Sequence, residues 1–171
     1  MSKMTEKSAA YYIEKLQLNA HVEGGAFKET YRSALKIAHK YLPPDFKGKR
    51  NVSTAIYFLL KEGEFSAMHK IASDELWHFY AGAPLHIYEL NAAGELHTHV
   101  LGNDLDNGES FQVLIPAGSW FGSRCETPNA FSLAGCTVAP GFDFEDFELA
   151  DKDVLISQFP AHKELWEQMC L

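Results

Sequence analysis

The chain has few cysteines, and those it has are not spaced for bonding to one another. Its three cysteines, Cys125, Cys136 and Cys170, never form a Cys-x-x-Cys pair. An odd number of widely separated cysteines argues against a disulfide framework and fits reduced thiols in the cytoplasm. The stretch from Met1 to Lys7 is polar, so no secretory signal is expected there.

The chain also lacks an excess of positive charge and a long hydrophobic run. Its 15 Lys and Arg residues stand against 23 Asp and Glu residues, which gives a formal net charge of -8. Nucleic-acid binding needs clustered basic side chains, so a nucleic-acid partner is not expected. The longest basic stretch, Lys47 to Arg50, follows two prolines and is interpreted as a solvated loop. Without a run of about 18 apolar residues, no membrane-spanning helix is expected either.

Most of the sequence alternates between short apolar segments and turns. The segments are rich in β-branched and aromatic residues, and the turns recur about every 8 to 12 residues with no helical pattern between them, which indicates an all-β sandwich or barrel. Asn107-Gly108 is the strongest hairpin signal, because both residues tolerate the positive φ of a type I′ turn. The expected strands are Phe27–Ser33, Val52–Leu60, Phe65–Ile71, Leu76–Tyr80, Leu85–Leu90, Leu96–Leu101, Phe111–Ile115, Trp120–Arg124 and Phe131–Val138.

Helical periodicity is confined to the two ends. Apolar residues spaced along one face predict a helix at about residues 9–18, with Ser8 as its N-cap, and a second at about 161–169 after Pro160. No repeat, low-complexity segment or linker interrupts the chain. We therefore expect one domain over residues 1–171, with its core at about 23–150.

Two motifs resemble those of the cupin superfamily. The first has the spacing of Gly63, His69, Glu75 and Gly82, and the second is the sequence Pro116-Ala-Gly-Ser-Trp-Phe121. The resemblance implies an all-β fold, a double-stranded β-helix or jelly-roll barrel, with short helices at the two termini.

Three longer stretches are similar to one branch of cupins, the cupin-5 group, which is a domain of unknown function. They are Glu23–Ser33, Ser73–His78 and Cys136–Leu149. The resemblance runs from about Tyr11 to Pro160. It implies a homodimer, for which we expect a strand at Phe27 to Arg32 to form part of the interface, and it supplies no activity.

Typical metal cupins, according to the resemblance, bind their metal with three histidines and one glutamate. Here only His69 and Glu75 remain, because Ile71 and Phe121 stand at the other two positions. A catalytic zinc or iron site usually needs at least three protein ligands, so we expect no metal and no other cofactor. If a metal binds, its ligands are His69, Glu75 and His78, although strand alternation places His78 on the face opposite Glu75.

His97 and His99 form a second His-x-His pair on one face of an expected strand. Leu96, Thr98 and Val100 occupy the other face, which we interpret as the barrel interior. Both histidines are therefore expected to face solvent.

His69 and Glu75 are the candidate catalytic residues. Burying two ionisable groups in a barrel is costly unless they are paired or used, and a plain ion pair between them is the structural alternative. Their separation crosses a turn, so we expect them to face the same cavity from consecutive strands. For the aromatic members of the expected ligand-binding set, core packing is the alternative. That set is Phe27, Glu29, Ile71, Trp77 and Phe121.

The sequence Gly25-Ala-Phe-Lys-Glu29 resembles the N-terminal strand of the dTDP-4-dehydrorhamnose epimerases, where this strand contacts the nucleotide sugar. That resemblance gives His69 the role of general base. The chain departs from it at Gly24, where the epimerases have arginine, and no tyrosine follows Phe121 to act as the acid. Asp143 or Asp146 is the alternative partner.

We therefore expect a small-molecule pocket without strong metal dependence, for a sugar, a nucleotide sugar or a small carbonyl compound. The first alternative is a metal-independent epimerase or isomerase that uses His69 as general base. The second is a degenerate metal cupin. The residues leave binding and catalysis both open.

Overall fold

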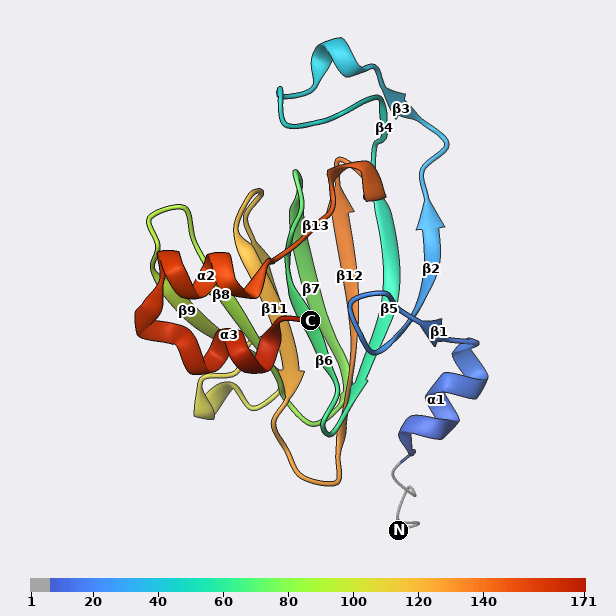
Figure 1. Cartoon of the computed structure of the whole chain (residues 1–171). Helices are drawn as coiled ribbons and strands as arrows, with labels where there is room; N and C mark the ends of the chain where they lie inside the picture. The colour runs from blue at the N-terminus through green and yellow to red at the C-terminus, as the bar shows by residue number, and fades with distance from the viewer. Residues whose placement is uncertain (1–6) are drawn as a thin grey trace.

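Two β-sheets pack face to face in a jelly roll in the computed structural model, which describes residues 7–171 (Figure 1). One sheet has the strand order β1 (Asn19–Ala20), β2 (Ala26–Arg32), β5 (Thr54–Lys61), β12 (Phe131–Ala139), β7 (Asp74–Gly82) and β10 (Gln112–Ile115). The other has the order β13 (Glu148–Leu149), β6 (Phe65–Lys70), β11 (Trp120–Cys125), β8 (Leu85–Leu90) and β9 (Leu96–Leu101). The short pair β3 (Lys36–Ile37) and β4 (Arg50–Asn51) stands apart. All nine expected strands are present, so the all-β fold is confirmed.

The helices lie outside the barrel. Helix α1 (Ala9–Leu16) has Ser8 as its N-cap, as expected. The side chain of Ser8 accepts a hydrogen bond from the backbone of Tyr11. Helix α3 (Lys163–Met169) matches the expected C-terminal helix, but α2 (Lys152–Gln158) was not expected. Its signal was available, since Asp151 is the N-cap and accepts from the backbone of Val154. Within residues 7–171 no helix is long and apolar enough to cross a membrane.

The prediction of a hairpin at Asn107-Gly108 is wrong. A 3₁₀ turn, Leu105–Asn107, occupies this position, and Gly108 follows it with a φ of 82°. The flanking strands do not pair with each other, because β9 pairs with β8 in one sheet and β10 pairs with β7 in the other. The glycine supplies the expected left-handed conformation, but in a link between two sheets.

Three apolar clusters hold these layers together. The largest lies between the sheets and includes Phe58, Leu60 and Trp77. A second lies on the outer face of the β6–β11–β8 sheet, under α2 and α3, and is built around Trp166. The third packs α1 against the outer face of β5 and β12. Figure 1 shows the two C-terminal helices over one side of the barrel and α1 at the other.

The basic stretch ending at Arg50 does not lie wholly in solvent, which corrects the loop interpretation. Arg50 is only 3% exposed, and its guanidinium donates to Asp146, with Nη2 2.6 Å from Oδ1. It also donates to Glu145 at 3.2 Å. This pairing fixes the loop after β12 against strand β4. It therefore holds one wall of the cavity described below.

Candidate functional site

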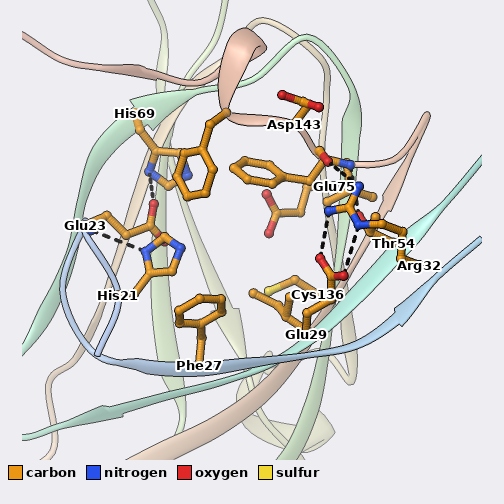
Figure 2. Close-up of a pocket in the computed structure, with 14 residues that line it drawn as sticks. His21, Glu23, Phe27, Glu29, Arg32, Thr54, His69, Glu75, Cys136 and Asp143 are labelled. Atoms are coloured by element: carbon orange, nitrogen blue, oxygen red, sulfur yellow. Dashed lines mark hydrogen bonds and ion pairs between the residues drawn. The ribbon is translucent and has the colours of Figure 1, made fainter. Parts of the chain in front are cut away.

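A cavity of about 210 Å³ opens between the two sheets, under strand β2 and the loop that follows β12. Figure 2 shows its side chains converging from both sheets and from the two loops. The lining residues are His21, Glu23, Phe27, Glu29, Arg32, Thr54, Ile56, His69, Glu75, Cys136, Val138, Phe142, Asp143 and Phe144.

The cavity brings His69 and Glu75 together from opposite sheets. His69 lies on β6 and Glu75 near the start of β7, and their exposed fractions are 4% and 7%. The His69 Nδ1 atom donates to the carbonyl oxygen of Ala67 at 2.7 Å, which fixes the ring and its tautomer. In the neutral ring Nε2 therefore carries the lone pair.

Glu23 is an ionisable cavity residue that the sequence analysis did not single out as a candidate. Its Oε2 lies 3.1 Å from His69 Nδ1, and its Oε1 lies 3.5 Å from Nδ1 of His21. Its carbonyl oxygen accepts from the backbone of Ala67 at 2.8 Å, so the loop before β2 is tied to β6. These contacts place a second buried carboxyl beside the imidazole of His69.

Two glycines allow this loop to enter the barrel. Gly24 has a φ of 109° and Gly25 a φ of 74°, which other residues rarely adopt. A Cβ at Gly24 would also collide with the carbonyl oxygen of Phe65. The pair Gly24-Gly25 directly after Glu23 was the available sequence signal, since successive glycines mark close approach of backbone to backbone.

Burial moves the pKa values of the four ionisable groups at the centre of the cavity toward their neutral forms. It raises the pKa of Glu75 to about 7, against the opposing effect of His69. It raises the pKa of Glu23 to about 7 as well, against that of His21. Burial also lowers the pKa of both His21 and His69. Near neutral pH the cavity therefore holds neutral imidazoles beside carboxyls that readily gain or lose a proton.

The mouth of the cavity carries an ion pair. Arg32 donates from Nη2 to Glu29 at 2.7 Å and from Nη1 to the carbonyl oxygen of Phe142 at 3.1 Å (Figure 2). Phe27 and Glu29, two of the expected ligand contacts, both line the cavity. Asp143 also lines it, whereas Asp146, the other proposed partner of His69, pairs with Arg50 instead.

The comparisons with known proteins show the family to which the chain belongs. The sequence profile of the family described as "Cupin superfamily (DUF985)" matches residues 10–150. The chain belongs to this family. The uncharacterized protein YML079W of Saccharomyces cerevisiae is 32% identical over 144 residues, which cover 78% of this chain and 71% of the yeast protein.

Two solved structures are similar over nearly the whole chain. Protein SO0799 from Shewanella oneidensis is 41% identical with a TM-score of 0.85, covering 96% of this chain and 98% of that one. A hypothetical protein from Leishmania major is 31% identical with the same TM-score, covering 96% and 99%. Oxalate decarboxylase from Bacillus subtilis is 14% identical with a TM-score of 0.54, covering 88% of this chain and 36% of that one, and shares the fold alone.

The cupin positions that bind metal in typical members do not fit a metal here. Ile71 and Phe121 offer no donor atom, and both are buried in the core. His78 does not join His69 and Glu75, because it lies on the outer face of β7, where it contacts Thr137 and Gln112. The alternative ligand set therefore does not form. Within residues 7–171 no group of three or more His, Cys, Asp or Glu side chains is arranged to hold a metal ion.

Three expected ligand contacts lie below the cavity and do not line it. Ile71, Trp77 and Phe121 are 5%, 1% and 1% exposed and belong to the core between the sheets. Strand alternation correctly predicted that they face the barrel interior. They lie deeper in that interior than the cavity, behind the side chains that line it. Phe121 still acts on the site, because its ring packs 4.1 Å from the imidazole of His69.

The face expected for His97 and His99 is wrong, although His97 is exposed to solvent as predicted and His99 is partly exposed. Their strand neighbours Glu89 and Ile87 are buried, and Leu101, two residues beyond His99, lies in the core between the sheets. The histidines therefore point to the inner side of their sheet, near its open edge. His99 contacts Glu89 through Nε2 at 2.8 Å, and neither histidine lines the cavity of His69.

Proposed function

We propose that the cavity binds a small polar organic molecule and moves a proton on it. The observation that carries the proposal is the convergence of three buried ionisable side chains, Glu23, His69 and Glu75, on one cavity. Burying such groups is costly, so a cluster of them in a cleft marks a site of use more often than a structural accident.

The size of the cavity favours a compact ligand. At about 210 Å³ it is smaller than the pockets of roughly 300–1,000 Å³ that hold drug-sized molecules. A single sugar ring or a short carbonyl compound fits this volume, whereas any nucleotide attached to it would have to extend through the mouth. Hydroxyl and carbonyl groups on such a ligand match the carboxyl and imidazole groups of the lining.

His69 has the arrangement of a general base. Its Nδ1–H is held by Ala67 and Glu23, which leaves Nε2 free to accept a proton. Burial lowers the pKa of its imidazole, so the ring is neutral near neutral pH. It can then take the proton from a carbon next to a carbonyl group, and the electron pair of the C–H bond moves to the carbonyl oxygen.

Glu75 supplies the acid that a tyrosine provides in the epimerases that the sequence resembles. With a pKa raised to about 7, its carboxyl is protonated in a large fraction of molecules near neutral pH. It can donate that proton to the enolate, which leaves His69 protonated and Glu75 ionised, and transfer of one proton between them restores both. General acids and bases work best when their pKa lies near the working pH.

Binding without chemistry is the second candidate, and one observation favours it. No tyrosine lines the cavity among the residues that the structure describes, so the acid of the related epimerases has no direct counterpart. In that case Glu23, His69 and Glu75 orient a polar ligand and no proton leaves it.

Exchange with solvent deuterium distinguishes the two candidates. A set of ketoses, aldoses and small α-hydroxy carbonyl compounds is incubated with the protein in heavy water, and proton NMR follows the hydrogens next to each carbonyl group. We expect at least one compound to lose such a signal with wild-type protein and with His99→Asn, but not with His69→Asn. A compound that binds in the cavity without exchange would refute proton transfer and leave the binding role.

A further inference from the structure

We infer that the natural ligand of this cavity carries a positive charge: it is a small organic ammonium compound, with an amino sugar as a good fit. The inference rests on the proposed function for the presence of a ligand, but it does not require proton transfer. It follows from the charges, the hydrogen bonds and the aromatic walls of the cavity.

Acidic groups outnumber basic ones around the cavity. Its lining has one guanidinium group, from Arg32, and no lysine among the residues that the structure describes. Two histidines also line it, and burial lowers the pKa of both, so they add little positive charge. The four carboxyl groups of the lining come from Glu23, Glu29, Glu75 and Asp143.

Arg32 is not free to receive an anionic ligand. Its Nε and Nη2 donate to the two carboxylate oxygens of Glu29 at 3.0 Å and 2.7 Å. Its Nη1 donates to Asn51 and to the carbonyl oxygen of Phe142 at 3.0 Å and 3.1 Å. All three of its nitrogens are thus engaged, and its charge is balanced within the protein. A phosphate or carboxylate in the cavity would meet acidic groups without a free cation.

Glu75 is the opposite case, a buried carboxyl whose neighbours are the imidazole of His69 and the thiol of Cys136 and not a lysine or an arginine. No lysine or arginine in residues 7–171 forms an ion pair with it or with Glu23, whose only ion-pair neighbours are His21 and His69. In Figure 2 the carboxyl of Glu75 lies between the group of Glu23 and His69 and the pair of Arg32 and Glu29. Burial has already removed most of its water, so an ammonium group placed beside it gains a charge-assisted hydrogen bond at little further desolvation cost to the protein.

Aromatic rings complete the walls. Phe27, Phe142 and Phe144 line the cavity, and the rings of Phe142 and Phe144 stand at 81° with centroids 5.0 Å apart. The face of an aromatic ring attracts a cation, and aromatic walls combined with carboxylates recur in sites for organic ammonium groups. Neutral and anionic ligands gain nothing from this electrostatic term.

A positive charge on the ligand also suits the proposed proton transfer. An ammonium group near the reacting carbon makes its C–H bond more acidic, because it stabilises the negative charge that develops when the proton leaves. Pairing with an ammonium group favours ionised Glu75, so with such a ligand the protonated His69, and not Glu75, returns the proton to the enolate. Glu75 then serves recognition and His69 serves the chemistry.

A charge series on one ring tests the inference. D-glucosamine, D-glucose and D-glucuronate have similar rings and differ in charge, and their binding to the full chain is measured by ligand-observed NMR and calorimetry at slightly acidic pH, where the amine is protonated. We expect glucosamine to bind at least tenfold more tightly than glucose, and glucuronate to bind more weakly than both. Calorimetry in two non-amine buffers of different ionisation enthalpy is expected to show proton release for glucosamine alone.

Matched variants assign the preference to the cavity. Glu75→Gln is expected to remove most of the tenfold preference for the amine. Glu148→Gln removes one charge from an exposed side chain that pairs with Lys70, and it is expected to leave the preference unchanged. Equal or tighter binding of glucuronate, no detectable binding of glucosamine at millimolar concentration, or an unchanged preference in Glu75→Gln would each overturn the inference. Preference for the amine without any deuterium exchange would support the inference while refuting proton transfer.

Discussion

Three glutamates among residues 7–171 are buried near histidines, and two of them, Glu75 and Glu89, differ in what satisfies their carboxyl groups. Glu89 is 6% exposed and accepts two hydrogen bonds, from Ser119 at 2.9 Å and from His99 at 2.8 Å. Glu75 is 7% exposed, and the side chain that hydrogen-bonds to it is the thiol of Cys136, which is a weak donor. A buried carboxyl alone therefore does not indicate a functional site. The useful sign is a buried carboxyl that lies beside a cavity and has only a weak donor.

Strand geometry explains the difference. Glu89 lies within one sheet, where β9 and the turn before β11 supply donors from directly neighbouring backbone. Glu75 lies on the other sheet from His69, and the two face each other across the barrel interior. Neighbours within a sheet can reach one another, whereas groups on opposing sheets leave room between them. That room is the cavity.

Replacing the two histidines in turn is expected to give the largest contrast. Because His69 is the proposed base, His69→Ala should abolish ligand binding or lower turnover by about 10²–10⁴-fold while the fold remains intact. His99→Ala should leave binding and turnover unchanged, since its ring contacts Glu89 outside the cavity. Calorimetry and deuterium exchange measure the effect, and circular dichroism checks the fold. Normal ligand binding by His69→Ala would make the site assignment wrong.

The pH dependence of stability should separate Glu75 from Glu89. The pKa of Glu75 is raised from 4.5 to about 7 in the folded protein, so between these values the folded state keeps a proton that the unfolded chain has lost. This group therefore costs stability as pH rises through that window, on the order of 3 kcal/mol when complete. Glu75→Gln removes the cost, so its gain in stability over wild type should be larger at about pH 8 than at about pH 5.

Urea unfolding of both proteins at the two pH values measures this gain. Glu89→Ala is the comparison, because it leaves the buried hydroxyl of Ser119 without its acceptor and should lower stability by about 1–3 kcal/mol. If Glu75→Gln also destabilises the protein at the higher pH, Glu75 is a structural residue like Glu89.

A substitution in the loop that carries Glu23 is expected to have a smaller effect on stability and ligand affinity. Gly24→Ala forces a Cβ against the carbonyl oxygen of Phe65 at a φ of 109°, so the loop must shift and move Glu23 away from His69. We expect a stability loss of about 2 kcal/mol and a weaker ligand affinity. Gly63→Ala is the matched control, since Gly63 also has positive φ, 76°, but a Cβ there meets nothing within 4 Å. Its backbone strain should cost about 1 kcal/mol and leave ligand affinity unchanged, as calorimetry would show.

The smallest effect concerns the edge of the sheet on the cavity side. Within residues 7–171 strand β1 pairs only with Ala26 and Phe27 and no other strand covers the outer edge of β2, on which Tyr31 is 53% exposed. We propose that a second copy covers this edge in a homodimer, because an open strand edge favours pairing. Light scattering at micromolar concentration should give the dimer mass, and Tyr31→Asp should weaken the dimer about tenfold. A monomeric wild-type protein would contradict this.

The sequence predicted the strands and that His69 and Glu75 line the same cavity, because alternation and the cupin spacing determine which face each residue takes. It did not predict that Ile71 and Trp77 lie behind the cavity, since alternation carries no information on depth. Glu23 was missed because a loop brings it in, through tertiary contacts that only Gly24 and Gly25 permit.

The error over His97 and His99 has a related cause. Their apolar neighbour Leu96 was expected to face the interior, yet it packs on the outer face of its sheet, in the cluster under α2 and α3. A covered outer face is as apolar as a barrel interior, and α2 was not predicted. Without the covering helices, the two faces of β9 cannot be told apart from the sequence.

The central claim is that Glu75 is a buried carboxyl held available for a proton or a cation. Carbon-13 NMR of the glutamate side-chain carboxyls, titrated across neutral pH in wild-type protein and in Glu75→Gln for assignment, tests it most directly. We expect the Glu75 signal to titrate with a midpoint of about 7. Addition of glucosamine is expected to move this midpoint to a lower pH. A midpoint near the ordinary value of 4.5, unmoved by glucosamine, would contradict the account.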